Sequence, residues 1–286
     1  MKTRIISGII AAAVLVLLLL LPPYVLAITV LAASAIGLFE FHKALKNKNI
    51  NTDLAVSLIS AVVITGKAYG STLSSQLFPK SSVLLQRIFT LKNLNALLFI
   101  LVIYLFCRVI FDSSRCRLED MAYTLLGIIY IPFLLSFAIM IRNLERGFGY
   151  IWLILIGSVV TDIFAYFVGV TIGRTKIIPH ISPKKTVEGS VGGAVGCMLV
   201  MILYGAVIIN RGGEAAIPLC HFAIMGLLCG VVAQLGDWAA SAIKRNTGIK
   251  DFGNLIPGHG GIMDRADSVL FVTPLIYIYI SLFISN

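Results

Sequence analysis

Nine apolar runs of roughly membrane-spanning length follow one another along this chain, and each is bounded by charged residues or by Gly and Pro. A helix crosses a bilayer with about 20 apolar residues, and a helix satisfies all of its own backbone groups there. The pattern predicts an all-α integral membrane protein, a polytopic bundle of about nine transmembrane helices. The predicted spans are 5–21, 24–41, 53–67, 94–111, 121–141, 150–170, 191–209, 217–235 and 266–284.

Composition excludes a soluble domain. Hydrophobic residues make up 58% of the chain and charged residues 13%, with a mean hydropathy of +0.97, whereas charged residues fill about a quarter of a soluble domain. The third span is the weakest, and the polar stretch 69–82 after it fits either a partly embedded helix or a loop. Pro22 and Pro23 favour a tight turn between the first two spans.

The distribution of Lys and Arg sets the orientation. Lys2 and Arg4 precede the first apolar run as in a secretory signal, but that run leads directly into a second one, so we interpret it as an uncleaved span. With nine spans, 16 of the 23 Lys and Arg residues fall on the side of the N-terminus. This side is therefore predicted to be cytoplasmic. The formal charge of +10 suits anionic lipid headgroups and needs no nucleic acid.

A carboxylate inside the sixth span is costly, at about 2.5 to 3.5 kcal/mol on insertion scales. Asp162 begins the series Asp162, Ala165, Tyr166, Gly169 and Gly173, whose spacing places all five residues on one helix face. The face fits two interpretations: it lines a cavity that admits a ligand, or it packs against another helix with one polar tie.

The loop after this span carries paired lysines. Lys184 and Lys185 precede Thr186, Gly189 and Ser190 at the start of the seventh span. Ammonium groups and free backbone N–H groups at a helix start suit phosphate oxygens. Paired lysines at a membrane edge also serve simply to fix the topology.

The eighth span runs into a polar helix end. Asp237, Ser241, Lys244 and Arg245 lie at offsets of 0, 4, 7 and 8 residues, which aligns them along one helix face. A carboxylate, a hydroxyl and two cations in a row suit a metal and a phosphate. A solvated helix end with one Asp paired to Lys or Arg explains them equally well.

A glycine-rich loop, 252–261, connects this helix to the last span. Glycines such as Gly260 and Gly261 let the backbone pass close to a ligand. The loop leads to Asp264 and Asp267 at the start of the final span, where the helix offers its free N–H groups. One such acid would suffice as an N-cap, but here acids, cations and a histidine come from both sides of the loop.

Carboxylates without paired His or Cys ligands indicate Mg²⁺, which uses one or two carboxylates together with phosphates and waters. Asp237 and Asp264 are the predicted pair of metal ligands. The predicted phosphate-binding cations are Lys244, Arg245, Lys250 and Arg265. This combination is typical of phosphoryl or nucleotidyl transfer at the cytoplasmic face.

The same residues carry a family resemblance. The string Ser241-x-Ile243-Lys244-Arg245-x4-Lys250-Asp251-x-Gly253-x2-Ile256-Pro257-x-His259-Gly260-Gly261-Ile262-x-Asp264-Arg265-x-Asp267 closely resembles the signature of phosphatidate cytidylyltransferases. Asp162-x2-Ala165-Tyr166 and Ser182-Pro183-Lys184-Lys185-Thr186-x-Glu188-Gly189 also resemble family motifs. The resemblance covers the chain from about residue 150 onward.

The resemblance implies an enzyme of phospholipid biosynthesis that converts CTP and phosphatidate into CDP-diacylglycerol and pyrophosphate with Mg²⁺. It implies metal binding by Asp237 and Asp264 and a catalytic region at 150–286, with 1–149 as a scaffold or lipid entrance. Asp251, His259 and Asp267 would orient ligands or neighbouring side chains in the catalytic set. Substrate-binding roles are expected for Asp162, Tyr166, Lys184, Lys185, Thr186, Ser241, Gly260 and Gly261.

Two alternatives stay open. One is cytidylyl transfer to another lipid phosphate; the other is a transporter, for which Asp162 inside a span would also be expected. A transporter predicts internal repeats and charges near the bilayer midplane, whereas the sequence shows no repeat and its charges cluster at one edge. A second cation and a homodimer are likewise left open. The expected location is an integral position in a membrane, the plasma or inner membrane if the source is bacterial, with the polar site and the N-terminus on the cytoplasmic side.

Overall fold

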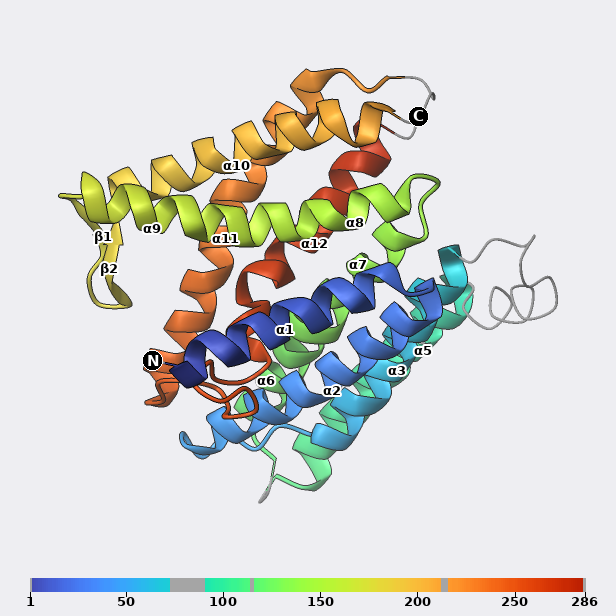
Figure 1. Cartoon of the computed structure of the whole chain (residues 1–286). Helices are drawn as coiled ribbons and strands as arrows, with labels where there is room; N and C mark the ends of the chain where they lie inside the picture. Colours follow the sequence, from blue (N-terminus) through green and yellow to red (C-terminus); the bar gives the residue numbers. More distant parts are fainter. Residues whose placement is uncertain (1, 73–90, 114–115, 212–215, 285–286) are drawn as a thin grey trace.

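The computed structural model describes residues 2–72, 91–113, 116–211 and 216–284, and these residues are mostly helical (Figure 1). Residues 73–82, part of the stretch for which helix and loop were both open, lie outside the described residues. The single helices are α1 (Lys2–Leu20), α2 (Pro23–Lys46), α3 (Leu54–Thr72), α5 (Leu91–Phe111), α10 (Val187–Val207), α11 (Leu219–Thr247) and α12 (Met263–Phe283).

Two further rods are each built from three helical segments. One consists of α6 (Leu118–Ile128), η1 (Ile129–Phe133) and α7 (Leu134–Arg142); the other consists of α8 (Gly147–Leu155), η2 (Ile156–Val160) and α9 (Thr161–Thr171). The segments η1 and η2 are π-helical. Pro132 lies inside η1, where it lacks the N–H that an α-helical ladder needs.

Every predicted apolar run coincides with one of these helices or rods. Within the described residues, six helices or rods are long and apolar enough to cross a membrane: α2, the two three-part rods, α10, α11 and α12. The shorter apolar stretches Ser7–Leu20, Leu54–Gly70 and Asn95–Phe111 account for the other three runs. The chain is therefore an all-α integral membrane protein with six candidate spans by length and composition.

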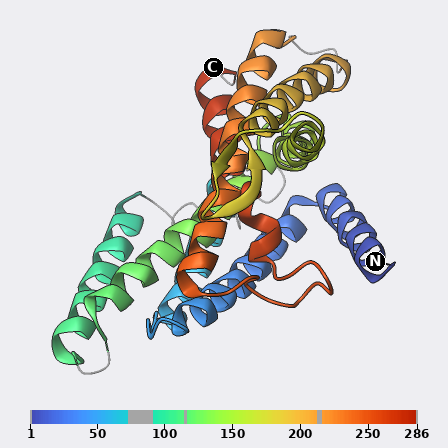
Figure 2. The same cartoon turned by 90° about the vertical axis from the view of Figure 1, so that its left-hand side faces the viewer.

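The turn predicted at the two prolines is present. α1 ends at Leu20, and α2 starts at Pro23 with Pro22 as its N-cap residue. Because a proline at the first helical position has no N–H to leave unpaired, it starts a helix well. Helix α2 then turns away from α1, and the two helices diverge from this turn (Figure 2).

A small β-hairpin is the exception to the all-α expectation. Strands β1 (Lys176–Ile178) and β2 (Ser182–Thr186) pair antiparallel between α9 and α10, in the segment that the sequence analysis treated as a loop. The hairpin is held to α10 because Glu188 accepts hydrogen bonds from the backbone N–H groups of Arg174 and Thr175. Figure 2 shows it in front of α11.

Helices α10, α11 and α12 form the centre of the C-terminal half, and small residues let them approach closely. A Cβ on Gly230 of α11 would lie 2.5 Å from Ala194 Cα of α10, so only glycine fits there. Thr273 Oγ1 of α12 donates to the Leu134 carbonyl oxygen of α7, which ties the two halves together. The boundary predicted between residues 149 and 150 falls inside α8.

Candidate active site

The C-terminal end of α11 carries the first group of predicted site residues. α11 continues as one helix to Thr247 and ends at Gly248, whose φ of 72° is left-handed. The predicted alignment of Asp237, Ser241, Lys244 and Arg245 on a helix is therefore confirmed. Ser241 Oγ lies 3.4 Å from Asp237 Oδ1, within hydrogen-bonding distance one turn along the helix.

Asp237 also meets a residue from the hairpin. Its carboxylate forms an ion pair with the Lys185 ammonium group, and Lys185 Nζ lies 5.8 Å from the centre of the Trp238 ring. Each of the two paired side chains is about a quarter exposed. The lysine-rich strand β2 thus reaches the carboxylate of α11, as expected for a common polar site.

Helices α11 and α12 are in close backbone contact beside this ion pair. A Cβ on Gly236 would collide with the carbonyl oxygen of Asp267 in α12. Glycine at this position therefore brings Asp237 near Asp267, and the two carboxylates interact electrostatically. Asp162 of α9 interacts with both of them, and with Lys185 and Arg265. Three predicted carboxylates from three helices therefore share one polar region.

Asp264 occupies a second position at the start of α12. Its Oδ1 accepts a hydrogen bond from Lys244 Nζ at 2.8 Å, and its Oδ2 accepts from the backbone N–H groups of Phe252 (2.8 Å) and Gly261 (3.0 Å). Gly260 adopts a left-handed φ of 83°, and a Cβ there would lie 2.6 Å from Asp264 Oδ2. Asp264 therefore binds the backbone at both ends of the glycine-rich loop and, through Lys244, links the loop to α11.

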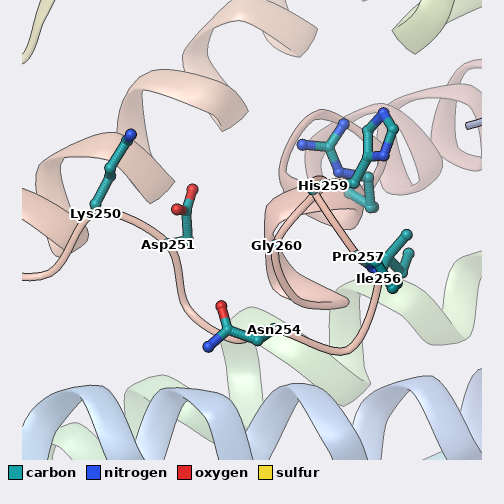
Figure 3. Close-up of a pocket in the computed structure, with 9 residues that line it drawn as sticks. Lys250, Asp251, Asn254, Ile256, Pro257, His259 and Gly260 are labelled. Carbon is teal, nitrogen blue, oxygen red and sulfur yellow. The ribbon is translucent and has the colours of Figure 1, made fainter. Parts of the chain in front are cut away.

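The loop encloses an open cavity of about 500 Å³ (Figure 3). A cavity of this size accommodates a small ligand such as a nucleotide. Figure 3 shows Lys250 and Asp251 on the chain that leaves α11, with His259 across the loop from them. His259 Nδ1 lies 2.9 Å from Ser7 Oγ, so α1 reaches the cavity wall. The lining residues are Lys250, Asp251, Asn254, Ile256, Pro257, Gly258, His259, Gly260 and Arg265.

Four further predicted site residues are either exposed at the surface or bonded within their own helix or hairpin. Thr186 is buried and caps α10 by accepting from the Gly189 N–H at 3.2 Å. Lys184 is exposed on β2, and Tyr166 is 66% exposed with its ring against Phe167. Arg245 is exposed, and its Nε lies 3.5 Å from the Ile181 carbonyl oxygen. Among the residues that the structure describes, none of these four side chains forms a hydrogen bond or an ion pair with Asp237 or Asp264.

The face predicted on the sixth span divides in two. Gly169 and Gly173 face Thr186, and a Cβ on Gly193 of α10 would lie 3.0 Å from Ala165 Cβ. Ala165 and Gly169 thus belong to a helix-packing face, one of the two interpretations left open, whereas Gly173 lies beyond the end of α9 at Thr171, so its predicted place on the helix face is wrong. Asp162, on the same helix, is exposed and interacts with the charges of the polar region.

The two predicted metal ligands differ in their accessibility. Lys244 and two backbone N–H groups hold both oxygens of the buried Asp264, whereas Asp237 keeps an oxygen for an ion that takes its other ligands from substrate and water. In the parts of the chain that the structure describes, no three His, Cys, Asp or Glu side chains converge as a metal cage. Asp237 is partly exposed, and its Oδ1 has only a long contact with Ser241. One or two such carboxylate oxygens with phosphates and waters match the way Mg²⁺ is usually bound.

Glu40 is a site residue that the sequence analysis did not identify. It lies in α2, and its buried carboxylate accepts hydrogen bonds from the backbone N–H groups of Ile262 and Met263. The available signal was the same as for Asp162, a carboxylate in an apolar span. Its partner, however, lies 222 residues further along the chain.

Comparisons with known proteins place the chain in a family. The model of the "Cytidylyltransferase family" matches residues 2–283. The chain is 32% identical over 284 residues to a phosphatidate cytidylyltransferase of Bacillus subtilis, covering 99% of this chain and 98% of the relative. A protein of the same name from Synechocystis is 30% identical over 316 residues, covering 98% and 96% of the two chains. One from Thermotoga maritima is 37% identical over 167 residues, covering 58% and 61%.

Proposed function

The chain belongs to the cytidylyltransferase family, and we propose that it transfers the cytidylyl group of CTP to phosphatidate, giving CDP-diacylglycerol and pyrophosphate. It is an enzyme of phospholipid biosynthesis, a nucleotidyltransferase of the membrane. The observation that carries this function is similarity along nearly the whole chain to proteins named phosphatidate cytidylyltransferase. The predicted signature residues gathered at the ends of α11 and α12 supply a site for it.

The reaction is an in-line substitution at phosphorus. An oxygen of the phosphatidate phosphate attacks the α-phosphorus of CTP, the bond from that phosphorus to the oxygen of the β-phosphate breaks, and pyrophosphate leaves. The attacking phosphate is already anionic, so the reaction needs no general base. The protein's contribution is to position two anionic substrates and to stabilise the charge that develops between them.

The cavity beside the glycine-rich loop suits the triphosphate. Lys250, His259 and Arg265 line it, and the backbone at Gly260 can approach a phosphate closely. Asp251 lines the same cavity and would orient these cations or the ribose. Lys244 and Lys185 are held by carboxylates in the structure and would share their charge with the bound phosphates.

Mg²⁺ is the proposed cofactor, with Asp237 and Asp264 as its protein ligands. When bound, the ion would neutralise phosphate oxygens and so favour attack by an anion. Asp267 and Asp162 interact electrostatically with Asp237 and, in their ionised form, would add to the negative potential that attracts the ion.

The proposed topology has nine spans, with α1, α3 and α5 added to the six longer candidates. It places the N-terminus and the site at the cytoplasmic face, because the excess of Lys and Arg falls on that side. The location is then the plasma or inner membrane, where CTP arrives from the cytoplasm and the lipid stays in the bilayer. A homodimer is compatible with this arrangement, since every proposed site residue belongs to one chain.

The test is product analysis with purified protein in detergent. Protein, CTP, phosphatidate and Mg²⁺ are combined, pyrophosphate is assayed and the lipid is identified by mass spectrometry; each component is omitted in turn. We expect CDP-diacylglycerol and equal amounts of pyrophosphate only in the complete mixture. Product from an ether lipid phosphate or a polyprenyl phosphate but not from phosphatidate would overturn the substrate assignment. Absence of product from folded protein with every lipid would overturn the enzyme assignment and favour transport.

A further inference from the structure

Glu40 is a buried acid in an otherwise apolar part of α2. Its side chain is 6% exposed, and the residues on either side of it are Phe39 and Phe41. Acidic side chains in transmembrane segments are rare and mark functional positions. The N-terminal half, to which α2 belongs, contributes none of the signature residues, so this carboxylate needs a separate explanation.

The carboxylate of Glu40 caps the first turn of α12. Its Oε1 accepts from the Ile262 N–H at 3.1 Å, and its Oε2 accepts from the Met263 N–H at 2.9 Å. The first N–H groups of a helix have no partner inside the helix and form its positive end. A negative charge from another helix satisfies both donors, so α2 fixes where α12 begins.

Two glycines of the loop pack directly on this carboxylate. A Cβ on Gly253 or on Gly261 would collide with Glu40 Oε1, and at Gly261 the three nearest atoms all belong to Glu40. Only glycine therefore fits at these two positions, where the loop packs around the Glu40 carboxylate. Glu40 lies between the outgoing and returning strands of the loop.

Asp264 holds the neighbouring donors of the same two strands. It accepts from Phe252, next to Gly253, and from Gly261, next to Ile262. Glu40 and Asp264 together bind the backbone N–H groups of residues 252, 261, 262 and 263. A displacement of Glu40 therefore displaces the loop that carries Asp264 and the cavity residues Gly260 and Arg265.

We propose that Glu40 is a positioning residue for cytidylyl transfer: it fixes the glycine-rich loop and the start of α12, and thereby the shape of the nucleotide cavity. This role rests on the proposed function for its catalytic consequence, but the structural part stands on the contacts alone. It also gives the N-terminal half a share in the reaction that the signature residues do not indicate.

The first test compares Glu40→Gln with wild-type protein. Glutamine keeps the shape but offers one acceptor, and its amide N–H₂ faces a second N–H donor. We expect the CTP concentration at half-saturation to rise by about ten-fold, as when other supporting groups of a site are lost, with no change for phosphatidate. A loss of folded protein lowers the rate at saturation but does not change half-saturation. Unchanged half-saturation for CTP would overturn the proposal.

Asp120 offers a matched control. It is a buried acid of α6 that likewise accepts from two backbone N–H groups, those of Asn51 and Arg117, and it also lies 3.8 Å from Arg117 Nε. Among the described residues, it forms no hydrogen bond or ion pair with the loop. Asp120→Asn should lower thermal stability and leave half-saturation by CTP unchanged. The same rise in both variants would show a general loss of structure and contradict a positioning role for Glu40.

A rescue experiment needs no substrate and so separates this inference from the proposed function. Hydrogen exchange is measured over residues 252–263 in Gly261→Ala, Glu40→Ala and the double variant. We expect Gly261→Ala to accelerate exchange by displacing Glu40, and the double variant to exchange no faster than Glu40→Ala, since the added methyl then has space. Exchange in the double variant that equals the product of the two single effects would overturn the proposal. Exchange at the wild-type rate in all three variants would also overturn the proposal.

Discussion

Lys244 Nζ lies 2.8 Å from Asp264 Oδ1, and this ion pair joins the last turns of α11 to the first turn of α12. Both side chains are largely buried, with 12% and 3% of their surfaces exposed. The two residues are 20 positions apart, and the loop between them forms the cavity wall. The pair therefore closes the loop that the proposed nucleotide site depends on.

Loss of Lys244 should destabilise the protein as well as inactivate it. In Lys244→Ala the buried Asp264 charge keeps only its two backbone donors, and removing one partner of a buried ion pair costs about 3 to 5 kcal/mol. We expect a clearly lower unfolding temperature in detergent and a loss of turnover. Arg245→Ala is the comparison, because Arg245 is exposed and its Nε contact is long. Equal unfolding temperatures for the two variants would contradict the structural role of the pair.

Asp237 should be required for turnover but not for folding. Its carboxylate is partly exposed and pairs with Lys185, so Asp237→Asn leaves no fully buried charge without a partner. We expect turnover to fall by at least about 100-fold, the usual loss for a group that stabilises charge in a transition state. The unfolding temperature should stay within a few degrees of wild type. Normal turnover in the folded variant would remove Asp237 from the proposed metal ligands.

The close approach of α11 to α12 at Gly236 predicts a severe effect of a single methyl group. In Gly236→Ala the new Cβ collides with the backbone carbonyl oxygen of Asp267, and backbone cannot move aside as a side-chain end can. We expect separation of the two helices, a lower unfolding temperature and loss of turnover.

The glycine that follows the last residue of α11 provides the control for this substitution. Gly248 has a left-handed φ of 72°, and its Cβ would have open space. Gly248→Ala should therefore cost only about 1 kcal/mol of backbone strain. If Gly236→Ala were as mild as Gly248→Ala, the close helix contact described above would be wrong.

Removal of divalent cations should abolish activity reversibly. The proposed site supplies few protein ligands, so the ion depends on the phosphates of the substrate for its remaining ligands. Excess EDTA should stop pyrophosphate release, and added Mg²⁺ should restore it, while circular dichroism stays unchanged. Undiminished pyrophosphate release in excess EDTA would contradict the assignment of Asp237 and Asp264 as metal ligands.

The helical layout could be predicted from the sequence because an apolar run of about 20 residues by itself indicates a membrane helix, whatever the rest of the chain does. The runs fall on helices, and Pro22 and Pro23 separate α1 from α2. The polar residues from Asp237 to Arg245 continue α11 beyond its apolar part, as their spacing predicted. The β1–β2 hairpin was missed because its strands are only three and five residues long, too short for an alternating pattern to stand out. The π-helical segments were missed because apolar spacing does not distinguish them from α-helix.

The sequence identified most of the residues of the candidate site, but few of the contacts between them. Helix periodicity placed Asp237 and Ser241 together correctly, since the two are one turn apart on one helix. The pairing of Lys185 with Asp237 and the capping of α12 by Glu40 join residues that are 52 and 223 positions apart. Such pairs depend on how helices pack, which a local pattern does not contain.

The transfer itself is tested most directly by following the phosphorus atoms of CTP. Purified protein is given phosphatidate, Mg²⁺ and CTP labelled with ³²P at either the α or the γ position, and the lipid fraction is extracted. Cytidylyl transfer predicts that the lipid gains label from α-labelled CTP alone and that the γ label appears in pyrophosphate. Label entering the lipid from the γ position would show phosphorylation, and no label in the lipid from either position would contradict cytidylyl transfer.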